Sequence, residues 1–239
     1  KEFLVCYMIK LLKTNKMTNI EKFKPLPPDS KVLVINLKLI GDLIVSTSAV
    51  SALKKSNPVC KITMLVRKGF EEVLSGNPDI DKIITYNKNC KNELGFCEKL
   101  KYEFSFIKKI RTSKYDVVIA LHPWDKNALW AFLSGAKIRI GVSKQSFSYL
   151  FNKKIDVRED TISYLDYYRK ITEPVSDYTS KVSPSFFVSD DDDFKAERIL
   201  ESFKIKNDEY IIGIHLGSSD SSKVIPSEKV VELLSELTS

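Results

Sequence analysis

Short continuous apolar runs alternate with longer amphipathic stretches along the first two thirds of the chain. Continuous runs are typical of parallel strands covered on both faces, and apolar positions spaced by three and four are typical of helices with one buried face. The pattern predicts strands at residues 32–36, 61–66, 82–86, 117–121 and 139–142. It predicts helices at residues 43–56, 69–75, 98–112 and 126–134. This alternation favours an α/β fold with a doubly wound parallel sheet.

The same pattern restarts further along the chain. Residues 162–171 and 194–203 have helical periodicity, and the aspartates at 190–193 are expected to cap the second of these helices. A strand at 210–215, a Ser-rich loop and a helix at 227–237 then repeat the order seen from residue 31. We therefore expect three parts: a basic, amphipathic extension with a proline linker (1–30), a Rossmann-like domain (31–184) and the incomplete beginning of a second one (185–239).

Composition narrows the class of protein only moderately. With 239 residues, 43% hydrophobic and 29% charged, the chain is expected to be soluble and globular. A net charge of +7 favours anionic partners such as phosphates, nucleotides or an acidic lipid surface. The four cysteines form no CxxC pair, and the two histidines lie far from them in sequence, so we expect reduced thiols and no metal site.

The N-terminal stretch has two interpretations. Apolar residues between 3 and 12 can share one helical face, with Lys10, Lys13 and Lys16 available for anionic headgroups. The alternative is a helix packed on the domain or a frayed terminus. No apolar run approaches the roughly 20 residues that span a bilayer.

Asp42 is the residue with the clearest candidate chemistry. It lies in the turn between the first expected strand and helix, and ligands of open α/β sheets bind outside the carboxyl ends of the strands. An aspartate at a helix start serves by default as an N-cap. A carboxylate in that place can also accept the proton of an incoming hydroxyl while a good leaving group is displaced. The two roles can coexist.

The loop after His215 offers a complementary group of residues. Gly217, Ser218, Ser219 and Lys223 combine accessible backbone amides, hydroxyls and a cation just before a helix, which suits a phosphate or diphosphate without a metal. Such loops are common, so this signal alone is weak. GxGxxG and Walker A patterns are absent, which counts against a dinucleotide or P-loop site.

Three sequence blocks, in order, resemble family 9 glycosyltransferases, the ADP-heptose:lipopolysaccharide heptosyltransferases and their relatives. The blocks are KVLVINLKLIGDLIV and its continuation (31–84), YDVVIALHPWDKNALWAFLSGAKIRIGV (115–142) and IIGIHLGSSDSSKVIP (211–226). The resemblance covers the chain from about residue 31 onward.

The resemblance implies a GT-B enzyme with an N-terminal acceptor domain and a C-terminal nucleotide-sugar domain. The enzyme would be inverting and metal-independent, moving a heptose or similar sugar from a nucleotide-diphosphate donor to lipopolysaccharide or a related glycan acceptor. Asp42 would be the general base, and Ser218, Ser219 and Lys223 would contact the donor diphosphate. Four acceptor-side candidates are Gly41, His122, Trp124 and Lys126. For His122 and Trp124 a structural role in the core is the alternative.

The same resemblance sets expectations for partners and location. It implies no cofactor beyond an ADP-heptose-like donor, no nucleic-acid partner, and a cytoplasmic protein, with peripheral contact to an anionic inner membrane face as a further option.

Departures from the family pattern leave two alternative hypotheses about function. Val224 and Ile225 stand where relatives usually have an Arg and an aromatic residue, and the later Asp-Thr-Gly and His motif has no counterpart. The chain alone is therefore expected to bind donor poorly and to show little transfer. The rivals are a degenerate or truncated, non-catalytic binding protein and another nucleotide-dependent Rossmann-like enzyme.

Overall fold

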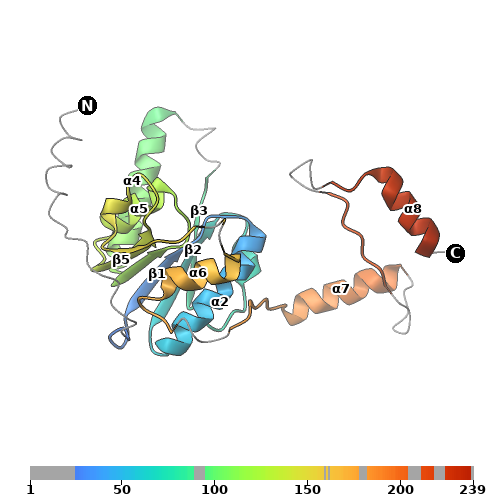
Figure 1. Cartoon of the computed structure of the whole chain (residues 1–239), viewed down its shortest axis with the longest axis horizontal. Coiled ribbons are helices and arrows are strands. Elements are labelled where there is room, and N and C mark those ends of the chain that lie inside the picture. The colour runs from blue at the N-terminus through green and yellow to red at the C-terminus, as the bar shows by residue number, and fades with distance from the viewer. Residues whose placement is uncertain are drawn as a thin grey trace. The chain divides into compact units, whose positions relative to one another are not determined.

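The computed structural model describes residues 25–88, 95–158, 160, 162–177, 182–203, 211–217 and 224–237. The chain divides into two compact units, Lys1–Ser189 and Asp190–Ser239. Figure 1 labels their helices and strands.

The first unit is built on a parallel sheet with the strand order β3-β2-β1-β4-β5-β6. The strands are β1 (Lys31–Ile35), β2 (Lys61–Arg67), β3 (Lys82–Tyr86), β4 (Val117–Ala120), β5 (Ile138–Val142) and β6 (Lys153–Ile155). Each neighbouring pair runs parallel. The predicted α/β fold with a parallel sheet is confirmed.

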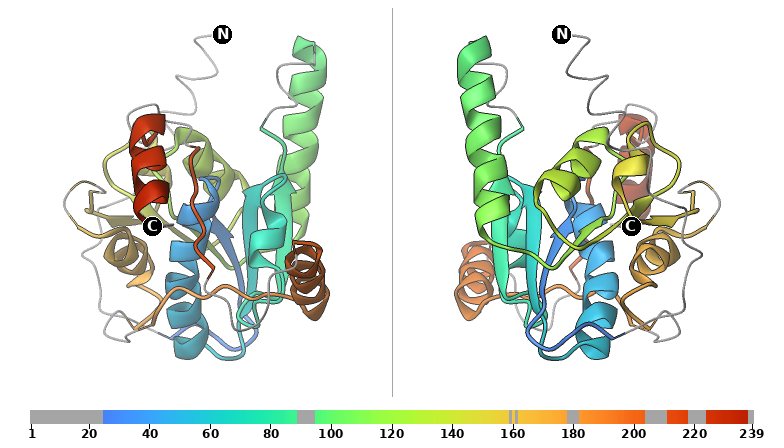
Figure 2. Two further views of the ribbon diagram at one scale, coloured as in Figure 1. Left: turned by 90° about the vertical axis from the view of Figure 1, so that its right-hand side faces the viewer. Right: turned by 90° about the vertical axis from the view of Figure 1, so that its left-hand side faces the viewer.

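Helices cover both faces of this sheet (Figure 2). One face packs against α2 (Ile40–Ser56), the short 3-10 helix η1 (Glu71–Leu74) and α6 (Tyr164–Thr172). The other face packs against α4 (Phe96–Thr112), α5 (Asp125–Leu133) and the 3-10 helix η2 (Ser148–Leu150). The chain changes face between β3 and α4 and returns to the first face between β6 and α6, so both faces are covered as in a doubly wound fold.

The central strand shows why its sequence is uninterruptedly apolar. Val32 and Val34 point into the cluster on the α2 face, whereas Leu33 and Ile35 point into the cluster on the α4 face. All four are at most 1% exposed. Because alternate side chains of a strand face opposite ways, a strand covered on both sides needs an apolar residue at every position.

Three elements of the first unit differ clearly from the expectations. Helix α2 begins at Ile40, three residues earlier than predicted, and residues 69–75 form only the 3-10 helix η1. Strand β6 was not expected, because it is three residues long, includes two lysines and lies at the sheet edge. Helix α6, expected at 162–171, spans Tyr164–Thr172 and packs on α2 (Figure 1).

The second unit contains α7 (Asp190–Ser202) and α8 (Ser227–Leu237). Helix α8 has the predicted bounds, but α7 begins at Asp190, so the aspartates form its first turn instead of preceding it. The strand predicted at 210–215 is wrong for its described part, because residues 211–217 adopt no regular structure. A strand needs a neighbour to pair with, and the described part of this unit contains no other strand. The predicted assignment of the two parts to acceptor and donor stays a prediction.

Candidate active site

The carboxyl ends of the three central strands lie in register. Ile35 is paired with Leu65 of β2 and with Ala120 of β4. The amide of Leu121 donates to the carbonyl of Ile35 at 3.0 Å, which extends the pairing one residue past β4. The turns that follow β1 and β4 therefore leave the sheet from neighbouring strands. Asp42 lies just after the first of these turns, and residues 122–126 follow β4.

Buried Asn36 shapes the turn after β1. Its side-chain carbonyl accepts the amide of Lys38 at 3.2 Å, and its side-chain NH2 donates to the backbone carbonyl of Asp42 at 3.3 Å. Asn36 is 0% exposed, so water cannot compete for these bonds. The turn and the start of α2 are thereby tied to the end of β1.

Asp42 is not the N-cap of α2. The N-cap is Leu39, in an extended conformation and without a side-chain cap, which places Asp42 at the third helical position. A carboxylate in the first turn still interacts favourably with the positive end of the helix dipole. The N-cap expectation is therefore wrong in position, because the helix starts earlier than its apolar stripe.

The Asp42 carboxylate is held on one side by two groups. Its Oδ1 accepts the Tyr168 hydroxyl at 2.7 Å and lies 3.4 Å from the Lys38 ammonium. Tyr168 is fully buried, whereas the Asp42 side chain is 25% exposed. A hydrogen bond from a buried hydroxyl and a nearby cation together fix the orientation of the carboxylate. Within the described chain, Oδ2 of Asp42 has no hydrogen-bond partner.

Tyr168 is the site residue that sequence reasoning missed. It belongs to α6, 126 residues after Asp42 in sequence, and reaches the site because α6 packs on α2. The same helix supplies Tyr164, whose ring lies 4.9 Å from the Lys38 ammonium. The aromatic run YLDYY on a predicted helix was a signal for a packed face, but not for a contact with Asp42.

His122 and Trp124 lie in the turn after β4, half-buried and 6.4 Å apart between ring centres. The carbonyl of His122 accepts the Trp124 amide at 2.8 Å and the Asn127 side chain at 3.1 Å. The Lys88 ammonium lies 4.6 Å from the Trp124 ring centre. These contacts suit a packed turn, and the acceptor-side role of both residues stays a prediction.

Lys126 has strong contacts within the protein. Its ammonium pairs with Glu103 and contacts the Tyr86 hydroxyl, which itself donates to Glu103 at 2.5 Å. The ammonium also lies 4.4 Å from the centre of the Tyr86 ring and 5.0 Å from that of Trp130. This cluster joins α4 to α5 and gives Lys126 a structural role. The acceptor-side role of Lys126 stays a prediction.

Gly41 lies at the start of α2, beside open space. A Cβ atom added there would meet no atom of the described chain within 4 Å. The glycine is therefore not required by packing, and the room beside it remains available to a ligand. Ser218, Ser219 and Lys223 lie outside the described residues, as does the N-terminal stretch 1–24.

The described residues offer neither a metal-binding cluster nor a membrane-spanning helix. No group of three or more His, Cys, Asp or Glu side chains is placed to hold a metal ion there. No helix in the described ranges has the length and apolar character needed to cross a membrane.

Comparison with known proteins assigns the family. The sequence model of glycosyltransferase family 9 (heptosyltransferase) matches residues 103–239, more than half of the chain. The chain belongs to glycosyltransferase family 9. The family membership expected from the three sequence blocks is confirmed.

Two relatives of the family 9 chain illustrate the similarity. Lipopolysaccharide heptosyltransferase 3 of Escherichia coli K12 is 33% identical over 119 residues, which cover 46% of this chain and 34% of the relative. Lipopolysaccharide heptosyltransferase 1 of Campylobacter coli is 24% identical over 213 residues, which cover 85% of this chain and 59% of the relative. The chain thus spans between one third and three fifths of these relatives.

Solved structures of family 9 proteins share the fold. A family 9 glycosyl transferase from Veillonella parvula superimposes with a TM-score of 0.77 at 23% identity, covering 88% of this chain and 60% of its own. The E. coli heptosyltransferase WaaC with ADP-2-deoxy-2-fluoro heptose gives a TM-score of 0.65 at 18% identity, covering 87% and 65%. The predicted Rossmann-like, GT-B type fold is confirmed.

Proposed function

We propose that this family 9 protein is an inverting, metal-independent glycosyltransferase that moves a heptose or similar sugar from a nucleotide-diphosphate donor to lipopolysaccharide or a related glycan. Family membership supports the reaction class. The observation that carries the mechanism is the Asp42 carboxylate, which the Tyr168 hydroxyl holds at the carboxyl end of β1.

In the proposed reaction Asp42 is the general base. Its Oδ2 accepts the proton of an acceptor hydroxyl while that oxygen forms a bond to the anomeric carbon of the donor sugar. The bond between this carbon and the diphosphate oxygen breaks on the opposite face, so the configuration inverts and the nucleoside diphosphate leaves with the electron pair. Lys38 and Tyr168 engage Oδ1 and leave Oδ2 for the hydroxyl.

We propose that the donor diphosphate is bound by Ser218, Ser219 and Lys223. Hydroxyls and a lysine ammonium can stabilise the charge of the leaving diphosphate without protonating it. Two solved structures of the E. coli heptosyltransferase WaaC are with ADP and with ADP-2-deoxy-2-fluoro heptose, which supports an ADP-heptose-like donor here. We also propose a cytoplasmic protein that meets a lipid-linked acceptor at the membrane face.

Substitution of Asp42 tests this proposal. In the natural protein, Asp42→Asn keeps the size of the side chain but cannot accept the proton, so kcat should fall by about 10²–10⁴-fold. The assay measures nucleoside diphosphate release from ADP-heptose with a lipopolysaccharide-type acceptor. Asp156→Asn is the control, because Asp156 is 72% exposed and pairs with a surface lysine.

The two outcomes separate the candidate functions. Loss of turnover with an unchanged melting temperature and unchanged donor affinity supports the general base. If Asp42→Asn retains more than half of kcat, or if the natural protein transfers no sugar, the catalytic proposal fails and a binding protein becomes the better description.

A further inference from the structure

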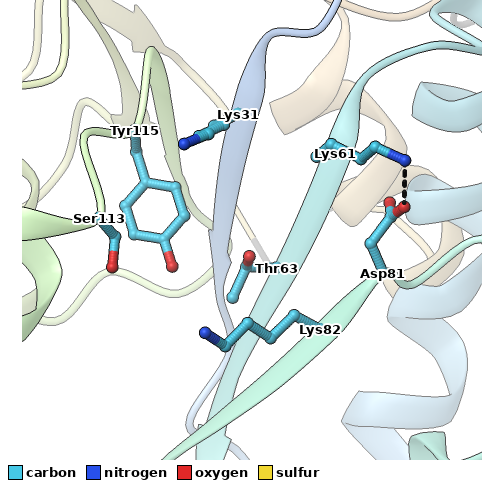
Figure 3. A pocket seen from close by; sticks show the side chains of 7 residues that line it. All are labelled: Lys31, Lys61, Thr63, Asp81, Lys82, Ser113 and Tyr115. Carbon is cyan, nitrogen blue, oxygen red and sulfur yellow. Dashed lines mark hydrogen bonds and ion pairs between the residues drawn. The ribbon is translucent and has the colours of Figure 1, made fainter.

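A pocket of about 350 Å³ lies at the amino ends of β1, β2 and β3 (Figure 3). Three of its residues, Lys31, Lys61 and Lys82, are the first residues of these strands. Asp42 follows the carboxyl end of β1, so the sheet separates this pocket from the candidate active site. The remaining lining residues are Thr63, Asp81, Ser113 and Tyr115.

Asp81, the carboxylate in this pocket, already has ion-pair and hydrogen-bond partners within the protein. Asp81 pairs with Lys61 at 3.3 Å and with Lys54 at 3.1 Å, and it accepts the Ile62 amide at 2.8 Å. Partial burial by itself would raise its pKa, but the Ile62 amide and the two lysines together bring the pKa of Asp81 below the ordinary value. Figure 3 shows Lys61 directed to Asp81 and away from the rest of the pocket.

Two cations and two hydroxyls in the pocket remain without a partner within the described chain. No described carboxylate lies in ion-pair distance of the Lys31 or Lys82 ammonium, and neither the Thr63 nor the Tyr115 hydroxyl makes a hydrogen bond there. Thr63 and Tyr115 are 6% and 7% exposed, so they are fixed by packing. Ser113 differs, because its hydroxyl donates to the Lys109 carbonyl at 2.9 Å.

Strand register brings these four groups to one place. Lys82 is paired with Thr63, and Lys31 with Lys61. Figure 3 shows the Lys31 ammonium directed towards Tyr115, with the Lys82 ammonium near Thr63. A buried threonine and tyrosine thus present hydroxyls between two ammonium groups.

A second basic pocket adjoins the first. It has a volume of about 310 Å³, shares Tyr115 with the first and is lined by Arg111, Lys114 and Lys137. The carboxylate of Asp116 also lines it. Cations therefore exceed carboxylates in both pockets, and a groove with one dominant sign of charge concentrates ligands of the opposite sign.

We propose that Lys31, Thr63, Lys82 and Tyr115 form a binding site for the phosphate group of an anionic ligand. A phosphate offers several oxygens that accept charge-assisted hydrogen bonds from ammonium groups and ordinary ones from hydroxyls. The volume is at the small end of ligand pockets, which suits a diphosphate or a phosphorylated sugar. A free phosphorylated metabolite and a lipid headgroup present this same chemical group.

Calorimetry with inorganic phosphate and pyrophosphate tests the site in the 239-residue chain. Saturable binding should weaken about tenfold or more in the double variant Lys31→Gln/Lys82→Gln, since two charged donors are lost. Tyr115→Phe should weaken it less, because only a neutral donor is removed. Lys101→Gln/Lys108→Gln, on the exposed face of α4, is the charge-matched control and should stay within about twofold of wild type.

Vesicle flotation identifies the source of the phosphate group. Binding to vesicles of phosphatidylcholine with phosphatidic acid that pyrophosphate displaces, and that the Lys31/Lys82 variant lacks, assigns the site to a lipid headgroup. Pyrophosphate binding without vesicle binding assigns it to a soluble metabolite. The proposal is overturned if wild type binds neither ligand saturably, or if the control pair loses as much affinity as the pocket pair in folded protein.

Discussion

The two edges of the sheet in the first unit carry charge in different ways. At the carboxyl edge, Asp42 and Lys38 are paired with each other and held by the buried side chains of Asn36 and Tyr168. At the amino edge, Lys31 and Lys82 are placed by strand register, and their ammonium groups have no ion-pair partner in the described part of the chain. One edge is organised around a carboxylate before any ligand arrives, whereas the other is left with positive charge for a ligand to neutralise.

The largest expected effect beyond Asp42 itself concerns the group that holds it. Tyr168→Phe removes the hydroxyl that donates to Oδ1, so we expect kcat to fall about tenfold or more with KM changed little, because misplaced catalytic groups lose rate steeply. Stability should fall by only about 1 kcal/mol. Steady-state kinetics and thermal unfolding of the natural protein measure both.

Tyr167→Phe is the matched control for that comparison, because Tyr167 is an equally buried neighbour on α6. If both variants lose the same fraction of kcat, the effect comes from packing of α6 and not from the bond to Asp42. A KM increase with unchanged kcat in Tyr168→Phe would also contradict a positioning role.

The next prediction concerns the amino edge and its pH dependence. The folded state lowers the pKa of Asp81, so its ionised form stabilises the fold above the unfolded pKa near 4, and this contribution is lost as the pH falls through the folded pKa. Asp81→Asn should therefore cost about 1 kcal/mol at pH 7 and less at a pH well below 4. Urea unfolding at several pH values tests this, and an equal cost at both pH values would show that the charge is not responsible.

The smallest effect on stability is expected at Gly41, on the carboxyl edge. Gly41→Ala should raise stability by less than about 1 kcal/mol, since alanine favours a helix and its methyl group meets no neighbour, but the position lies in the first turn of α2. If the acceptor approaches α2 at this point, the same methyl group should raise the acceptor KM. A variant with wild-type acceptor KM would remove Gly41 from the acceptor-side residues, and melting curves would check the gain in stability.

The sequence predicted the sheet better than it predicted the helix starts. Apolar runs located β3 to the residue and the other four predicted strands to within one residue at each end. The start of α2 was placed too late, because exposed Leu39 and Ile40 lie outside the buried stripe from which the helix was inferred. Strand β6 and the missing strand at 211–215 depend on whether a neighbouring strand is present, which a local pattern does not reveal.

By itself the sequence determined the family, the parallel sheet and the position of Asp42 beyond the carboxyl end of β1, because these follow from local hydrophobic pattern and ordered motifs. Only the tertiary structure decided what surrounds that carboxylate. The packing of α6 on α2 brings Tyr168 to Asp42 across 126 positions of sequence, and the register of β1, β2 and β3 gathers Lys31, Thr63 and Lys82 at the other edge. The physical reason is the same in both places: side chains distant in sequence become neighbours only when the apolar faces of their elements are buried together.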